Sequence, residues 1–176
     1  MTHNEDRALS ILAAALEKEK KGRDFYKEAS DKCVNPLGKE IFRILMVDEG
    51  AHVKRVMEIF DTISKGQKWD TNWKHYKVEN RDLQKLFRKR IETIGSRVQG
   101  DNSDIEAISI GLEMEQGAIK FYEDQLSKAT DPLEKEFATV MIDEERGHFG
   151  ALKDLKMYLA DPELWFAQIE RAQLDG

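Results

Sequence analysis

Residues 143–150 read DEERGHFG and residues 48–55 read DEGAHVKR, so each stretch places a histidine three positions after a glutamate. One such spacing in a glutamate-rich chain carries little weight. Here the two pairs, Glu49 with His52 and Glu145 with His148, stand 96 positions apart. Two pairs at one offset carry more weight if the rest of the chain repeats with the same offset.

It does, over most of the chain and without a gap. The further positions that coincide are Glu19 with Glu115, Phe25-Tyr26 with Phe121-Tyr122, and Pro36 with Pro132. The repeat predicts two copies of one helical hairpin, at about 6–65 and 103–160, joined by a crossover at 66–102 within a single domain.

The composition excludes several classes of protein. The 176 residues are 40% hydrophobic and 35% charged, which is typical of a helix-rich globular chain long enough to bury a core. The net charge of −6, with basic and acidic residues interspersed, argues against nucleic-acid binding. No apolar run approaches the roughly 18 residues of a membrane span, and the N-terminus lacks a secretory signal. We therefore expect a cytoplasmic protein without a membrane partner.

Three proline positions mark helix starts, because each proline follows Asn or Asp, the residue types that cap helix N-termini. They lead to predicted helices at 6–31, 36–65, 103–129, 132–160 and 162–173. The crossover contains an amphipathic segment with helical spacing, formed by Leu83, Leu86, Phe87, Ile91, Ile94 and Val98. The predicted fold is all-α, a four-helix bundle with a long crossover and a short C-terminal helix.

A carboxylate interrupts the apolar stripe of each of the four long helices, and two of the stripes also contain a histidine. Each glutamate taken alone reads best as a tolerated polar residue on a partly solvated face. The free-energy cost of burying four carboxylates together would be prohibitive without nearby positive charge. No Lys or Arg occupies the centre of these stripes. The residues concerned are Glu19, Glu49, His52, Glu115, Glu145 and His148.

The charge of two divalent cations would balance that of four carboxylates. Neutral histidines would add nitrogen ligands without changing the net charge of the site. One glutamate from each of two helices and a Glu-x-x-His from each of the others is the arrangement of di-iron and di-manganese bundles. We therefore expect two iron ions. Glu and His ligands also accept manganese or zinc, so the residues alone do not identify the metal.

The segments EKKGRDFY from Glu19, EQGAIKFY from Glu115, DEGAHVKR from Asp48 and DEERGHFG from Asp143 resemble the metal-ligand segments of the rubrerythrin family. The resemblance spans nearly the whole chain and implies a ferritin-like bundle with the same six ligands. It also implies that Glu49 and Glu145 bridge the two metals, while Glu19 and Glu115 are terminal ligands.

The chain departs from the family pattern in two ways. Most rubrerythrins have a rubredoxin-like domain whose iron is held by four cysteines, but Cys33 is the only cysteine here. Electrons would then come from a separate donor, such as a rubredoxin-like protein. The extra glutamate that the family uses in peroxide reduction is replaced by Ala118. This weakens the expectation of peroxidase activity without removing it.

Several neighbours of the six residues invite a role. Asp48 and Glu144 point about 100° away from the adjacent ligands, so we expect them to support the ligands or to lie on the surface. Tyr26 and Tyr122 lie two helical turns after Glu19 and Glu115, where they either hydrogen-bond a ligand carboxylate or pack in the core. We also expect Gly50, Gly117 and Gly147 to permit close helix approach.

Assembly and activity are also predicted. Exposed aromatic residues at Trp69, Trp73 and Trp165, together with the long crossover, suggest a homodimer; the alternative for Trp69 and Trp73 is packing over a bundle end. The favoured function is a non-haem di-iron oxidoreductase that reduces hydrogen peroxide or dioxygen. The alternatives are a ferroxidase and iron storage protein, or a metal-stabilised bundle without turnover.

Overall fold

The computed structural model describes residues 3–78, 82–94 and 101–174, and it is an all-α bundle, which confirms the predicted class. Every predicted helix is present with bounds within three residues of those expected, and only Val98 of the crossover stripe lies outside the described residues. The elements are α1 (His3–Lys32), α2 (Pro36–Ser64), the 3₁₀ helix η1 (Asn72–His75), α3 (Leu83–Ile94), α4 (Asn102–Lys128), α5 (Pro132–Ala160) and α6 (Pro162–Leu174).

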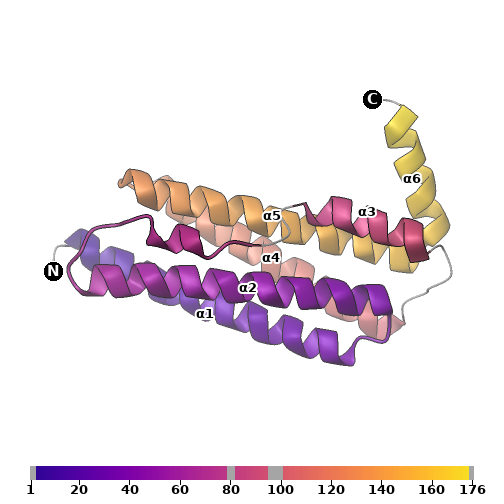
Figure 1. Ribbon diagram of the computed structural model, residues 1–176, viewed down its shortest axis with the longest axis horizontal. Helices are drawn as coiled ribbons and strands as arrows, with labels where there is room; N and C mark the ends of the chain where they lie inside the picture. The colour runs from indigo at the N-terminus through magenta and orange to yellow at the C-terminus, as the bar shows by residue number, and fades with distance from the viewer. Residues whose placement is uncertain (1–2, 79–81, 95–100, 175–176) are drawn as a thin grey trace.

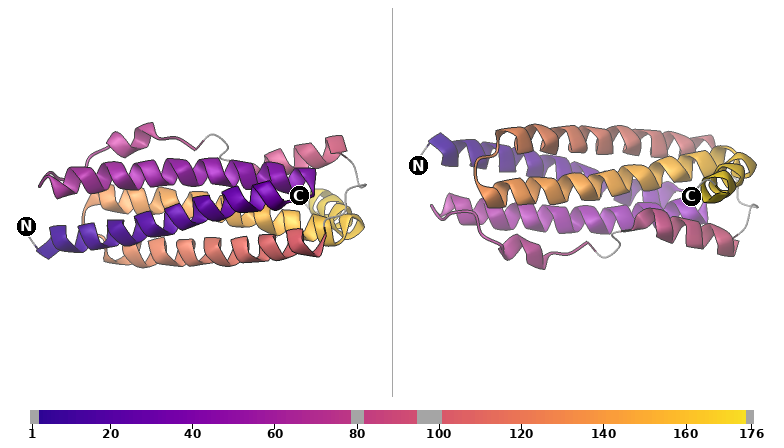
Figure 2. Two further views of the ribbon diagram at one scale, coloured as in Figure 1. Left: turned by 90° about the horizontal axis from the view of Figure 1, so that it is seen from below. Right: turned by 90° about the horizontal axis from the view of Figure 1, so that it is seen from above.

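The four long helices form two hairpins, α1 with α2 and α4 with α5, that lie side by side (Figures 1 and 2). The crossover from α2 to α4 runs along the face formed by α2 and α5, where η1 packs on α2 and α3 packs on α5. The opposite face of the bundle is formed by α1 and α4. The bundle therefore has one face covered by the crossover and one without it.

The predicted caps fix where the helices start. The side-chain oxygen of Asn35 accepts a hydrogen bond from the Gly38 amide at 2.9 Å, and that of Asp131 accepts from the Leu133 amide at 2.8 Å. Asp161 caps α6 in the same way. Since proline at the first helical position has no amide hydrogen to satisfy, each Asn-Pro or Asp-Pro pair both ends the preceding loop and starts the next helix.

Two apolar clusters fill the bundle, one towards each end. The first includes Tyr26, Phe42 and Phe87, and the second includes Tyr122 and Met141. The six polar residues singled out above lie in the layer between the clusters and are themselves buried. Water is thus excluded from the polar layer by apolar packing along the bundle axis in both directions.

Two predictions about packing are wrong. No described atom lies within 4 Å of where a β-carbon would stand on Gly50, Gly117 or Gly147, so these glycines do not mediate close helix contacts. The expectation that Trp73 and Trp165 are exposed is also wrong, because each is only 2% exposed and packs against other aromatic rings. The alternative for Trp69 and Trp73, packing over a bundle end, is correct, since both rings contact Phe137. The homodimer therefore stays a prediction that rests on the crossover alone.

Candidate metal centre

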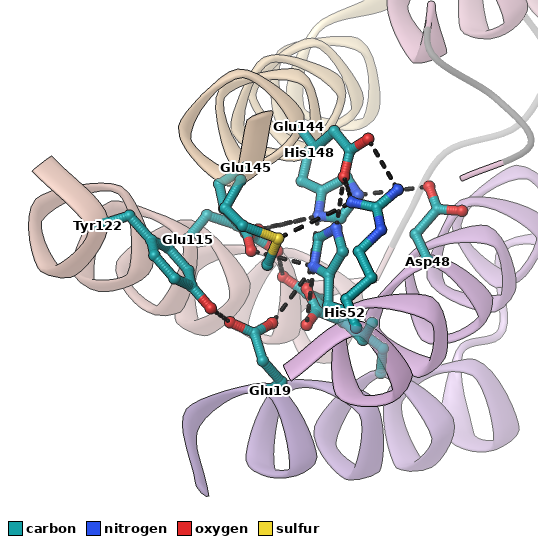
Figure 3. A network of polar contacts seen from close by, with 12 residues as sticks. Glu19, Asp48, His52, Glu115, Tyr122, Glu144, Glu145 and His148 are labelled. Atoms are coloured by element: carbon teal, nitrogen blue, oxygen red, sulfur yellow. Dashed lines mark hydrogen bonds and ion pairs between the residues drawn. The ribbon is translucent and has the colours of Figure 1, made fainter. Parts of the chain in front are cut away.

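The structure brings the six predicted residues together at the centre of the bundle (Figure 3), where each is at most 4% exposed. Their ligand atoms form two groups, within each of which the atoms lie no more than 4.8 Å apart. The groups are Glu19, Glu49, His52 and Glu145, and Glu49, Glu115, Glu145 and His148. Each group offers one nitrogen and three carboxylates, a donor set that suits a divalent transition metal.

Glu49 and Glu145 belong to both groups, whereas Glu19 and Glu115 belong to one each. This division matches the bridging and terminal roles that the family resemblance implies. The two groups follow the sequence repeat, because α1 and α2 supply most of one group and α4 and α5 most of the other. That the six residues bind metal remains a prediction, which the geometry supports.

The two histidines direct the same ring nitrogen towards the carboxylates. Nδ1 of His52 lies 3.3 Å from Glu19 and 3.2 Å from Glu145. Nδ1 of His148 lies 3.1 Å from Glu145 and 3.4 Å from Glu49. The two imidazole rings are stacked, with their centroids 5.5 Å apart. Both Nδ1 atoms are thus placed to bind a cation held by the carboxylates.

The outer nitrogen of each histidine meets a carboxylate from the other sequence repeat. Nε2 of His52 lies 3.0 Å from Glu144, and Nε2 of His148 lies 3.3 Å from Asp48. A carboxylate at this position favours the tautomer with the proton on Nε2, which leaves Nδ1 free as a ligand. Asp48 and Glu144 thus contact the two predicted histidine ligands, and the surface alternative is wrong for both because they are largely buried.

The two tyrosines also pair across the repeats. The Tyr122 hydroxyl on α4 donates a hydrogen bond to Glu19 on α1 at 2.5 Å, and the Tyr26 hydroxyl on α1 donates one to Glu115 on α4. Both rings are buried in the apolar clusters as well. The hydrogen bond predicted as one of two alternatives is therefore present, and it fixes the two carboxylates expected to be terminal ligands.

Arg55 is a site neighbour that the sequence analysis missed. Its side chain is buried on α2, one turn after His52, and pairs with Glu144 through both terminal nitrogens. Its Nε donates to the Tyr76 carbonyl in the crossover at 2.6 Å. The repeat-related position is Ala151, so α5 has no arginine at the position that matches Arg55. The helical spacing from His52 to Arg55 was the available signal.

Without metal, the charges of the carboxylates divide into two kinds. Burial, helped by the negative charge of Glu49 and Glu145, raises the pKa of Glu19 to about 8. Burial and Glu145 likewise raise the pKa of Glu115 well above its usual range. Burial also opposes ionisation of Glu49 and Glu145, but the two histidines outweigh it and lower both pKa values. The terminal carboxyls therefore hold a proton more readily than the shared ones.

The histidines complete this balance. Burial disfavours their charged forms, but Glu145 beside His52 and Glu115 beside His148 raise both pKa values well above the usual range. In the absence of metal, the centre therefore tends to keep protons on the histidines and on the terminal carboxyls. Two divalent cations would replace these protons and balance the charge of the four carboxylates. The residues present therefore fit a pair of divalent metals.

A cavity of about 230 Å³ reaches the centre from the face formed by α1 and α4. Its lining includes the three carboxylates Glu19, Glu49 and Glu115. Gly22 and Ala118, which are related by the repeat, also line it. A β-carbon on Gly22 would lie 3.2 Å from the Glu49 carboxyl group, so the glycine leaves room for that carboxylate. Small molecules can approach the centre from this side.

Other reactive side chains lie outside the centre. His75 is exposed in the crossover and contacts the Asn72 carbonyl, as expected for a residue without a ligand role. Cys33 is buried just after α1, and burial, with nearby Asp104, raises its thiol pKa to about 12. Across residues 3–78, 82–94 and 101–174, no helix combines the length and apolar character that a membrane span requires.

Comparison with known proteins identifies one family. The family model described as Rubrerythrin matches residues 10–156, which include all six clustered residues and both hairpins. A search of curated proteins and a search of solved structures each found no match. The matched range covers most of the chain.

Proposed function

The chain belongs to the rubrerythrin family, and we propose that it is a non-haem di-iron oxidoreductase that reduces hydrogen peroxide or dioxygen. Its electrons come from a separate donor protein. The observation that supports this most directly is the pair of ligand groups that share Glu49 and Glu145 in a buried layer. Two shared carboxylates would hold two metals close enough to act on one small molecule.

The six clustered residues would hold two ferrous ions, which would supply the two electrons needed to break an O–O bond. The protein residues provide the remaining conditions. Tyr26 and Tyr122 hold the terminal carboxylates, while Asp48 and Glu144 orient the histidines. The apolar clusters exclude water along the bundle axis, and the cavity between α1 and α4 admits the oxidant.

The proposal is tested by loading the apo protein with two equivalents of Fe(II) under anaerobic conditions and adding hydrogen peroxide. We expect one peroxide to oxidise two irons, with dioxygen compared in a parallel reaction. The iron should then be reducible again, and the cycle should repeat without loss of iron. Absence of oxidation by either reagent would refute the proposal.

The same preparation separates the alternatives. Continued uptake of iron beyond the two equivalents, with a large hollow assembly on size-exclusion chromatography, would favour ferroxidation and storage. Elemental analysis of protein purified from its native cells identifies the resident metal. Zinc alone, with no oxidation of added Fe(II), would favour a metal-stabilised bundle without turnover.

A further inference from the structure

The crossover differs in charge from the rest of the protein. Residues 66–102 contain nine Lys and Arg against five Asp and Glu, although the whole chain has a net charge of −6. The remainder therefore has a net charge of −10. We define the crossover face by its exposed cationic residues, which are Lys68, Lys74, Lys77, Lys85, Arg88, Lys89 and Arg90. An acidic protein thus presents one basic surface.

This face covers α2 and α5, opposite the face formed by α1 and α4 (Figures 1 and 2). The cavity that reaches the centre is lined mainly by α1 and α4. Lys74 pairs with Glu136 of α5 at 2.6 Å, and Arg90 pairs with Glu40 of α2 at 2.8 Å. These two pairs hold the crossover against the bundle and use two of its cations. The five other exposed cations outnumber the four described acidic residues of the crossover, Asp70, Asp82, Glu92 and Asp101.

Beneath this face, a chain of contacts leads inward to the metal centre. Lys74 lies over the Trp73 ring, 5.6 Å from its centroid, and Trp73 itself is only 2% exposed. The Arg55 guanidinium lies 6.0 Å from the centroid of the same ring and pairs with Glu144. Glu144 in turn contacts Nε2 of His52 at 3.0 Å. The surface and a predicted metal ligand are therefore joined by buried side chains in contact.

We propose that the crossover face docks an acidic one-electron donor protein, and that Trp73, Arg55 and Glu144 connect the docked donor to the metal centre. This inference rests on the proposed function, because it names the surface that receives the electrons. Two donor molecules each lose one electron. Hydrogen peroxide accepts both electrons and two protons, its O–O bond breaks, and two waters form. The oxidant and the donor would thus use opposite faces of the bundle.

Docking is tested with reduced rubredoxin, an acidic iron protein, as the probe. Its oxidation by the iron-loaded protein is followed by stopped-flow absorbance at several salt concentrations. The variant Lys68→Glu with Lys77→Glu should lower the second-order rate constant about tenfold at low salt and weaken its salt dependence. The matched control, Lys20→Glu with Lys120→Glu on α1 and α4, changes the net charge equally and should have a much smaller effect.

Binding is measured separately from electron transfer. Titration calorimetry with zinc-substituted rubredoxin should show a larger dissociation constant for the crossover variant than for the control variant. Equal constants for the two variants would overturn the docking surface. The two variants are also titrated with an oligonucleotide. If the crossover variant binds the oligonucleotide more weakly than the control variant does, while both bind rubredoxin equally, the partner is a nucleic acid and the proposal is wrong.

The inward connection is tested at Trp73. Trp73→Leu should lower the oxidation rate at saturating donor while leaving the donor's dissociation constant unchanged, and Trp73→Phe should retain most of the rate. Equal saturated rates for Leu and Phe would overturn the role of the ring. Should Trp73→Leu fail to fold, the lysine variants still decide the docking surface.

The proposed function is checked independently in every variant by reducing the iron with dithionite and then adding peroxide. If peroxide oxidises the dithionite-reduced iron, but the crossover and control variants oxidise rubredoxin at the same rate, only the proposed docking surface is contradicted. Absence of oxidation after dithionite reduction would contradict the proposed function itself.

Discussion

Glu144 on α5 lies 3.0 Å from Nε2 of His52 on α2, so a carboxylate of one sequence repeat orients a histidine of the other. Glu144 stays ionised, because hydrogen bonds from His52 and Arg55 outweigh its burial and lower its pKa to about 2. The reciprocal contact joins Asp48 to His148. Each predicted metal position therefore depends on residues from both hairpins.

This relationship predicts the effect of Glu144→Gln. The substitution keeps the side-chain size but removes the charge that holds the proton on His52 Nε2, so metal affinity should fall about 10–100-fold. The affinity is measured by competition with a chromophoric chelator. Glu113→Gln, an exposed change on α4, is the control and should leave the affinity unchanged. Equal affinities for the two variants would contradict the role given to Glu144.

Tyr122→Phe should weaken both the fold and the site. Removing the hydroxyl deletes the hydrogen bond to buried Glu19 and leaves that carboxyl less satisfied, which costs about 1–3 kcal/mol of apo stability. Chemical denaturation of the apo protein measures this cost. Tyr76→Phe, at a half-buried residue outside the centre, is the comparison. A cost no larger than that of Tyr76→Phe would show that the hydroxyl is dispensable.

Gly22 and Gly50 provide a matched pair of substitutions to alanine. Both lie inside helices, where alanine is favoured by about 1 kcal/mol. A β-carbon on Gly50 meets no described atom within 4 Å, so Gly50→Ala should stabilise the protein and leave metal binding unchanged. A β-carbon on Gly22 would lie 3.2 Å from the Glu49 carboxyl group, so Gly22→Ala should displace Glu49 and weaken metal binding. Identical metal affinities would exclude Gly22 from shaping the site.

The stability of the apo protein should fall as the pH rises from about 5 to 8. The pKa of Glu19 rises from 4.5 to about 8 on folding, chiefly through burial, so the native state retains a proton that the unfolded chain has lost in this range. His52 and His148, whose pKa values are raised above 6.5 in the fold, act in the same direction above that pH. Glu144 has a lowered pKa of about 2 and contributes only below about 4.5.

Metal should reverse this trend, because binding releases the protons held by the four raised groups. Thermal melts of the apo and Mn(II)-loaded protein at pH 5, 6, 7 and 8 provide the check. We expect the apo midpoint to fall and the metal-dependent shift to grow with pH. An apo midpoint that rises over the whole range would contradict the raised pKa values of Glu19, His52 and His148.

The sequence was sufficient to predict the helices and the six clustered residues, because each depends on local features. Asn35-Pro36 and Asp131-Pro132 mark helix starts whatever the tertiary structure, and the repeat supplies each ligand segment twice. A residue in the apolar stripe of a helix must also face the core. The orientation of the six side chains towards the core therefore follows from helical spacing alone.

The neighbours of the six residues could not be predicted in the same way, because their roles depend on which helices face each other. Asp48 meets His148 only because α2 and α5 lie side by side. Arg55 is useful only because its neighbour on α5 is Glu144 and the crossover brings the Tyr76 carbonyl to it. For Trp73, exposure and packing over a bundle end both stayed open, because the sequence does not show that η1 packs it onto Phe137.

The central claim is that Glu49 and Glu145 hold two metals between the hairpins. It is tested most directly by anaerobic titration of the apo protein with Fe(II), in which bound iron per chain is counted after gel filtration. We predict two irons for the wild type and for Glu113→Ala, and no more than one, weakly bound, for Glu145→Ala, which removes a ligand shared by both positions. A Glu145→Ala protein that still binds two irons as tightly as the wild type would contradict the assignment of the site.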